Sequence, residues 1–295
     1  MAARTGTVVY KITPSGVLTT LHSFDSTDGA NPDVALVQGA NGVLYGVTGF
    51  GGARGHGTIF KITMGGTFAV IHSFNNTSGA EPYGSLVQIG QGDLYGTTIG
   101  GGTAGYGTVF QTTTGGKVTT LHSFDGTDGK EPIGALVLGT DGNLYGTTAL
   151  GGANGYGTVF QITPGGALTT LHSFDYTDGD GPYAGLLQAT NGTFYGTTYS
   201  AGAYGYGTVF GLSMGLGPFV ESLPTSGKTA STVEILGTDL TGATSVTFNG
   251  TAASFTVVSA SAISTTVPVG ATTGTIQVVT PGGTLSSNVA FQVLP

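Results

Sequence analysis

The sequence predicts an all-β protein in which a small β-propeller is followed by a β-sandwich, and three observations predict it. The tetrapeptide Leu/Ile-His-Ser-Phe returns every fifty residues, with its histidine at His22, His72, His122 and His172. Within each repeat, short runs of β-branched and aromatic residues alternate with Gly-rich turns, a pattern typical of strands and not of helices. From Gly217 the repeat disappears and Thr/Ser/Val alternation continues. Such tandem units bury apolar surface mainly against their neighbours.

Each repeat is expected to hold four short antiparallel strands, which is the composition of a propeller blade. In one repeat we place them at residues 83–89, 93–99, 108–113 and 117–124. Tight turns separate them, because Gly tolerates the positive φ that hairpins require. The turns between first and second strands are Asn41-Gly42, Gln91-Gly92, Asp141-Gly142 and Asn191-Gly192, and those between third and fourth strands are Gly65-Gly66, Gly115-Gly116 and Gly165-Gly166.

The number of strands leaves the closure of the ring open. The chain begins with a third and a fourth strand, continues through three whole repeats and ends the array with a first, second and third strand, seventeen in all. Four blades are favoured. In this arrangement the first and second strands of the last repeat join the third and fourth strands at the N-terminus to make one blade. A ring of five blades is the alternative. The third strand of Tyr10 or of Phe210 is then surplus, and an unpaired edge can recruit a second copy in a strand-swapped oligomer.

The lining of a narrow ring should carry small residues. Gly84-Ser85, Gly134-Ala135 and Ala184-Gly185 stand where the first strands would line it. We therefore expect these segments to approach one another closely at the centre of the array.

A domain boundary is expected at the Gly-rich segment 214–218, which gives a propeller over residues 1–215 and a second domain over residues 216–295. The second domain is long enough for a small sandwich of short strands. Its motifs resemble the IPT/TIG immunoglobulin-like family: Leu-Pro-Thr-Ser-Gly at 223–227, Gly-Thr-Asp-Leu at 237–240, Val-Thr-Phe-Asn-Gly at 246–250 and Val-Val-Thr-Pro-Gly-Gly at 278–283.

The repeats themselves resemble the bacterial tandem repeats called GloVer. The resemblance rests on Asn-Gly-Thr-Phe-Tyr-Gly-Thr-Thr at 191–198 and Gly-Tyr-Gly-Thr-Val-Phe at 205–210. It implies an exported or cell-surface bacterial protein and supplies neither catalytic residues nor a substrate. Residues 1–4 lie inside a repeat without a basic and apolar leader before them, so we expect a removed leader or a fragment.

The composition excludes several classes of function. Seven Lys and Arg residues and a formal net charge of −8 disfavour nucleic acid and anionic membranes as partners. The apolar residues form strand patterns and never a run of about 18, so membrane insertion is not expected. The chain has no Cys, which excludes disulfides, thiol catalysis and cysteine metal sites.

The loops from fourth to first strands and from second to third strands should emerge on one face. Ten of the twelve acidic residues before Gly215 fall in or beside the first set: Asp25, Asp28, Asp33, Glu81, Asp125, Asp128, Glu131, Asp175, Asp178 and Asp180. One hypothesis is a Ca²⁺ site in one or more loops, with Asp25 and Asp28, Asp125 and Asp128, or Asp175 and Asp178 as ligands. The other is an Asx-turn in which the first Asp accepts hydrogen bonds from the backbone amides two and three positions further on. The second repeat favours the turn, because Asn75 and Ser78 keep the acceptors and lose the charges.

The second set of loops presents an aromatic residue beside flexible glycines. The candidate ligand-binding residues are His56, Tyr106, Tyr156 and Tyr206, together with Tyr176 of the first set. A Tyr ring can stack on a sugar whose hydroxyls bond to carboxylates and amides, although such a residue also suits packing between blades. The loops lack the helix and Lys of phosphate-binding loops.

No residue is assigned a catalytic role. The repeated histidines suit hydrogen bonds at blade interfaces better than a single catalytic site, while Asp175, Asp178 and Asp180 leave glycoside cleavage open. The favoured function is a non-enzymatic, extracellular binding or adhesion module for carbohydrate or a surface polymer, where repeated weak sites gain avidity. The alternatives are a self-assembling surface or filament protein and a polysaccharide hydrolase or lyase. No cofactor other than Ca²⁺ is expected.

Overall fold

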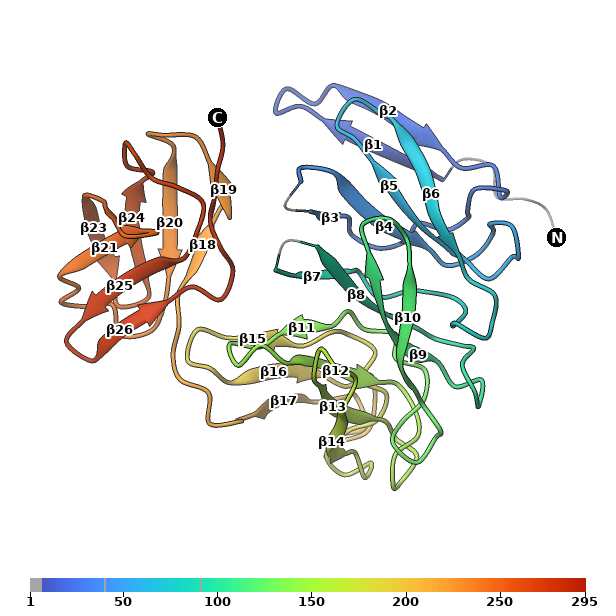
Figure 1. The fold of residues 1–295 in the computed structure, drawn as a ribbon. Helices are drawn as coiled ribbons and strands as arrows, with labels where there is room; N and C mark the ends of the chain where they lie inside the picture. The colour runs from blue at the N-terminus through green and yellow to red at the C-terminus, as the bar shows by residue number, and fades with distance from the viewer. Residues whose placement is uncertain (1–6, 40, 91) are drawn as a thin grey trace. The chain divides into compact units, whose positions relative to one another are not determined.

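The computed structural model describes residues 7–39, 41–90 and 92–295, and all regular elements there are β-strands (Figure 1). The all-β prediction is confirmed. The described chain forms two compact units. The first holds the residues up to Leu138 with 142–186 and 196–210, and the second holds 139–141, 187–195 and 211–295.

Three complete four-stranded sheets form the middle of the repeat array. In each, the strands follow one another in chain order and pair antiparallel, which is the arrangement of a propeller blade. The sheets are β3 (Val37–Gln38), β4 (Leu44–Thr48), β5 (Thr58–Ile62) and β6 (Phe68–Ser73); β7 (Val87–Ile89), β8 (Asp93–Thr98), β9 (Thr108–Thr113) and β10 (Val118–Ser123); and β11 (Val137–Leu138), β12 (Leu144–Thr148), β13 (Thr158–Ile162) and β14 (Leu168–Ser173).

The first strand of each repeat is shorter than expected: β7 begins at Val87, and residues 83–86 are irregular. Close backbone contacts explain this. A β-carbon on Gly134 would lie 2.7 Å from the amide nitrogen of Gly185, and one on Gly84 would lie 3.0 Å from the carbonyl oxygen of Gly134. Successive repeats therefore meet through small residues at these segments, as the sequence predicted.

The array ends in two incomplete sheets. At one end, β1 (Val8–Ile12) pairs with β2 (Leu18–Ser23); at the other, β15 (Leu187–Gln188), β16 (Phe194–Thr197) and β17 (Val209–Leu212) form a three-stranded sheet. The predicted composite blade is therefore wrong for the described chain, because β16 pairs with β17 and not with β1. A short loop with an Ala201–Tyr206 bridge, equivalent to the Gly101–Tyr106 and Gly151–Tyr156 bridges, brings β17 to its own repeat. Seventeen strands in five successive sheets result.

Apolar side chains fill the seams between successive sheets of the repeats. One seam joins Tyr45 and Ile59 to Leu94 and Phe110, and all four are at most 1% exposed. The Phe of each Leu/Ile-His-Ser-Phe segment meets a third-strand Phe of the next repeat edge to face. The ring centroids are 5.3, 5.2, 5.3 and 5.1 Å apart for Phe24–Phe60, Phe74–Phe110, Phe124–Phe160 and Phe174–Phe210. The repeated motif therefore serves the interface between blades.

The C-terminal region forms a β-sandwich, as predicted. One sheet has the order β18 (Glu221–Leu223), β20 (Thr232–Leu236), β24 (Ala262–Thr266), β23 (Phe255–Ser259), and the other β22 (Thr251–Ala252), β21 (Ser245–Phe248), β25 (Ile276–Thr280), β26 (Gly283–Ser286). A parallel pair joins β19 (Ser226–Gly227) to β27 (Gln292–Val293). Alternating residues of the strands, among them Val233, Ile235, Val246 and Phe248, form one buried core.

Candidate functional site

Two sets of loops lie side by side at one end of the sheets, and we call this end the loop face. One set connects the fourth strand of a sheet to the next sheet, and the other connects second and third strands. Isolated bridges join the sets in every repeat: Ala30 to Phe50, Ala80 to Gly100, Lys130 to Leu150 and Asp180 to Ser200. The predicted common face is confirmed.

The first Asp of each acidic loop closes an Asx-turn. Asp125 Oδ1 accepts hydrogen bonds from the Thr127 amide at 2.8 Å, the Thr127 hydroxyl at 2.7 Å and the Asp128 amide at 3.3 Å. The Thr127 hydroxyl, followed by the backbone donors, lowers the pKa of the Asp125 carboxyl. Asp25 and Asp175 make the same bonds. The turn hypothesis is confirmed.

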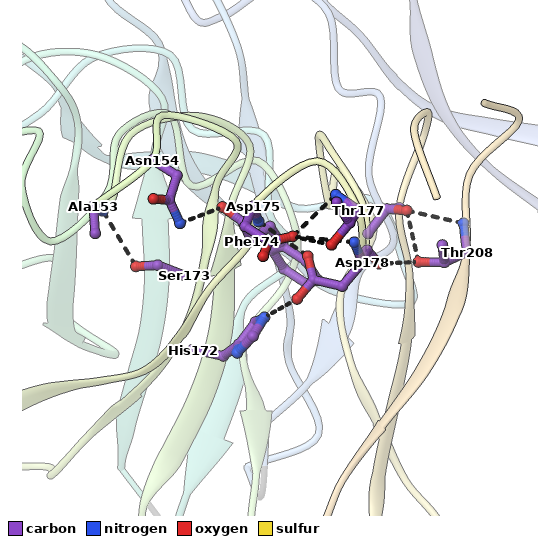
Figure 2. A network of polar contacts seen from close by, with 10 residues as sticks. Ala153, Asn154, His172, Ser173, Phe174, Asp175, Thr177, Asp178 and Thr208 are labelled. Atoms are coloured by element: carbon purple, nitrogen blue, oxygen red, sulfur yellow. Dashed lines mark hydrogen bonds and ion pairs between the residues drawn. The ribbon is translucent and has the colours of Figure 1, made fainter. Parts of the chain in front are cut away.

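The second Asp ties this turn to the histidine of the preceding strand, as Figure 2 shows for Asp178. The distance from His Nε2 to Asp Oδ2 is 2.7 Å for His22–Asp28, 2.6 Å for His122–Asp128 and 2.6 Å for His172–Asp178. The hydroxyl of Thr208 on the following repeat donates to the Asp178 carbonyl at 2.8 Å. His22, His122 and His172 therefore make the structural hydrogen bond expected of the repeated histidines.

The second repeat lacks this pair because Ser78 stands in place of the Asp. His72 Nε2 is buried without a hydrogen-bond partner. Burial lowers the pKa of the His72 imidazole, opposed by a backbone hydrogen bond with Gly116. This histidine differs from its three equivalents in its environment and not in its position.

The six aspartates that were candidates for Ca²⁺ ligands all accept hydrogen bonds from nearby groups of the protein. In the part of the chain that the structure describes, no group of three or more His, Asp or Glu side chains is placed to hold a metal ion. Asp25, Asp28, Asp125, Asp128, Asp175 and Asp178, which the sequence offered as Ca²⁺ ligands, accept bonds from Thr hydroxyls, backbone amides and the histidines. Their geometry supports a structural role in the turn.

The structure brings two of the predicted aromatic residues together. The rings of Tyr156 and Tyr176 lie 5.3 Å apart between centroids, and Tyr176 is 51% exposed. Tyr106 instead lies under the Lys130 ammonium, 5.6 Å from the ring centroid. Tyr206 is 92% exposed, and His56 is partly buried.

Sequence reasoning missed three further tyrosines of the last repeat on this face. Tyr183 and Tyr199 meet edge to face at 5.6 Å, and Tyr204 is almost fully exposed. The last repeat carries Tyr at five loop positions where the earlier repeats vary: Tyr176, Tyr183, Tyr199, Tyr204 and Tyr206. A comparison of equivalent positions, repeat by repeat, would have found them.

The backbone at Tyr176 is left-handed, with a φ of 74°, and so are its equivalents Ser26, Asn76 and Gly126, with φ values of 74°, 68° and 92°. A side chain with a β-carbon costs energy in that region, whereas Gly does not. The conformation therefore belongs to the turn in all four loops, and only the last of them presents an aromatic ring there.

A large cavity lies away from these residues. About 310 Å³ in volume, it is lined by Asn41, Tyr45, Lys61 and Thr114 near the turns at the other end of the blades. It contains no carboxylate and one aromatic ring, whose hydroxyl is bonded to Asn41 at 2.9 Å. We therefore place the candidate site on the loop face, where exposed rings and acidic loops meet.

The described residues include no helix long and apolar enough to span a membrane.

Three solved structures are distantly similar to this chain. A fungal alcohol oxidase in complex with copper is 12% identical with a TM-score of 0.40, covering 96% of this chain and 79% of that chain. A luciferin-regenerating enzyme is 12% identical with a TM-score of 0.46, covering 69% and 68%. A gluconolactonase from Xanthomonas campestris is 14% identical with a TM-score of 0.44, covering 89% and 80%. No curated protein matches the sequence.

Two families account for the sequence itself. The Gloeobacter/Verrucomicrobia repeat matches residues 2–140 and 115–254, and the IPT/TIG domain matches residues 218–293. Both resemblances noted from the sequence are confirmed, and the sandwich is the Ig-like fold of IPT/TIG domains. The repeat covers more than half of the sequence, so the chain belongs to the Gloeobacter/Verrucomicrobia repeat family, with an IPT/TIG domain at its C-terminal end.

Proposed function

We propose that this protein is a non-enzymatic binding or adhesion module that recognises carbohydrate or a surface polymer through the loop face of its last repeat. The observation that carries the proposal is the set of five tyrosines there. Their side chains are 51%, 43%, 76%, 89% and 92% exposed for Tyr176, Tyr183, Tyr199, Tyr204 and Tyr206. Exposed rings concentrated in one repeat have no role in the core and cost free energy in water.

The chemistry of this surface suits a sugar. The face of a Tyr ring packs against the apolar face of a pyranose, and its hydroxyl exchanges hydrogen bonds with sugar hydroxyls. Asp180 extends the polar part of the surface, since its carboxylate accepts a bond from the Ser200 hydroxyl at 3.0 Å. A net charge of −8 favours a neutral polymer over an acidic one.

The other repeats would add weaker contacts. Tyr106 and Tyr156 stand at the positions of Tyr206 in their own repeats, and His56 stands there in the first complete repeat. Several sites on one chain raise the effective concentration for a repeating polymer. Repeat and IPT/TIG domains together support an extracellular or cell-surface location for this binding.

A polysaccharide panel tests the proposal. The protein is incubated with insoluble and immobilised polysaccharides, and bound protein and released reducing ends are both measured. Retention without release is the expected result. If sugar ends are released, and this release is lost in Asp175→Asn or Asp178→Asn, the protein is a hydrolase or lyase. If the protein neither binds a polysaccharide nor releases sugar ends, the proposal is wrong.

The tyrosines are tested with a soluble oligosaccharide of the retained polymer. Titration calorimetry should show an affinity about fivefold weaker for Tyr204→Ala and for Tyr206→Ala, because one lost stacking contact is worth about 1 kcal/mol. Tyr10→Ala is the matched control, since Tyr10 is 56% exposed on β1 and not on the loop face. Unchanged affinity in both loop variants would contradict the assignment.

A further inference from the structure

The seams of the repeat array define two complementary faces on every sheet. The leading face packs against the preceding sheet, and the trailing face packs against the following one. In the best-described seam, Tyr45 and Ile59 belong to a trailing face, and Leu94 and Phe110 belong to the leading face that covers it. The next seam repeats this pattern with Tyr95 and Val109 against Leu144 and Phe160.

The leading face of the first sheet is uncovered in the described chain. Tyr10, Ile12 and Leu18 are 56%, 61% and 55% exposed. Tyr10 is equivalent to Phe60, Phe110 and Phe160, which are all 0% exposed, and Ile12 is equivalent to Ile62 and Ile162, also 0% exposed. This sheet therefore displays in water a surface that the other repeats bury completely.

The trailing face of the last sheet is uncovered in the same way. Val209 on β17 is 79% exposed, whereas its equivalents Ile59, Val109 and Val159 are 0%, 0% and 1% exposed. Thr197 on β16 is exposed, whereas Val47, Thr97 and Thr147 at the same position are each 1% exposed. Tyr195, earlier on β16, is 39% exposed.

These two faces are complementary by the geometry of the repeat, because in each internal seam a trailing face is covered by a leading face. Tyr10, Ile12, Thr197 and Val209 all belong to the first compact unit, and none of them is covered there. We propose that the trailing face of one copy of this chain packs on the leading face of a second copy, head to tail. Removal of both apolar surfaces from water drives the association.

The interface is heterologous, since it joins two different surfaces. Each added copy leaves one leading and one trailing face free, so the assembly grows with concentration unless it closes into a ring. This goes beyond the proposed polymer binding, and the two are separable, because the leading face on β1 and β2 contains none of the tyrosines of the last repeat.

Sedimentation velocity and light scattering over a range of concentrations test the proposal. For the wild-type protein, the average molecular mass in solution should increase with protein concentration. Ile12→Asp removes the leading face and Val209→Asp removes the trailing face, and each variant alone should stay monomeric. Both positions are exposed in the single chain, so the variants should keep the wild-type circular dichroism; if either misfolds, Tyr10→Lys and Thr197→Lys take their place.

The mixture of the two variants is the decisive measurement. Ile12→Asp keeps a trailing face and Val209→Asp keeps a leading face, so an equimolar mixture should form dimers and nothing larger. Val258→Asp is the control, because Val258 is 64% exposed in the IPT/TIG domain and should leave assembly unchanged. A monomeric wild type, assembly in either single variant, or a mixture without dimers would each overturn the proposal.

Discussion

The conformation of Tyr176 makes a direct prediction about stability and binding. Its φ of 74° is unfavourable for a residue with a β-carbon, and Gly126 occupies the equivalent position. Tyr176→Gly should raise the free energy of unfolding by about 1 kcal/mol while weakening polymer binding, because the strain and the ring are lost together. Urea unfolding and calorimetric titration measure the two effects. A variant that is less stable than wild type would show that the Tyr156 contact outweighs the strain.

The buried His72 predicts a pH dependence. Burial lowers its folded-state pKa below the ordinary value of 6.5, so folding favours the neutral imidazole. This contribution to stability is present above about pH 6.5 and is lost as the pH falls through the lower folded-state pKa. The free energy of unfolding should therefore decrease across this window.

Ser78→Asp should reduce that decrease. It places a carboxylate where Asp28, Asp128 and Asp178 lie 2.6–2.7 Å from the equivalent Nε2 atoms. A partly exposed pair of this kind contributes about 0.5 kcal/mol. Urea unfolding at about pH 7.5 and about pH 5.5 compares the variant with wild type, and equal losses in both proteins would contradict the pairing.

At the scale of the element, the acidic loop is a turn that depends on an acceptor more than on a charge. Asp125→Asn keeps the acceptor, as Asn75 does when it accepts the Ser78 amide at 2.9 Å. Asp125→Ala removes it. We therefore expect the melting temperature at neutral pH to decrease in the order wild type, Asn, Ala.

The charge adds a term that acid removes. The Thr127 hydroxyl and backbone donors lower the folded-state pKa of Asp125 from 3.8. The resulting stabilisation is present above about pH 3.8 and is lost as the pH falls through the folded-state pKa. The difference in melting temperature between wild type and Asp125→Asn should shrink over that range. A constant difference would show that the charge makes no contribution.

Strand pattern and turn chemistry predicted the elements of each repeat, and their limits have physical causes. The alternating residue pattern predicted that the first strand includes residues 83–86. In the structure these residues are not part of the strand, because Gly84 lies close to Gly134 of the next repeat. The Asx-turns were predictable because Asn75 and Ser78 act as a natural substitution within the chain. Tyr183 and Tyr199 were missed because they come together only when the two sets of loops meet in space. The blade that β1 and β16 were expected to share could not be judged from strand count alone.

For the whole molecule, the boundary predicted between residues 215 and 216 implies that residues 216–295 should fold independently as the IPT/TIG domain. Its core residues, from Val220 to Phe291, all belong to this segment. A fragment of residues 216–295 should therefore unfold cooperatively, with an enthalpy of about 55 kcal/mol near 60 °C, which is the value expected for a domain of this length. Scanning calorimetry of the fragment, beside residues 1–215 and the full chain, measures this.

Two hydrogen bonds between Thr190, before this boundary, and residues after it point to a competing outcome. The Phe219 amide donates to the Thr190 carbonyl at 2.9 Å, and the Thr190 and Thr238 hydroxyls are 2.9 Å apart. A fragment of residues 187–295 retains these bonds. Both fragments should unfold cooperatively, and the longer one should melt about 5–20 °C higher, since two hydrogen bonds contribute about 1–3 kcal/mol. Cooperative unfolding of the longer fragment alone would move the boundary into the last repeat, because the domain would then need Thr190 to complete its fold.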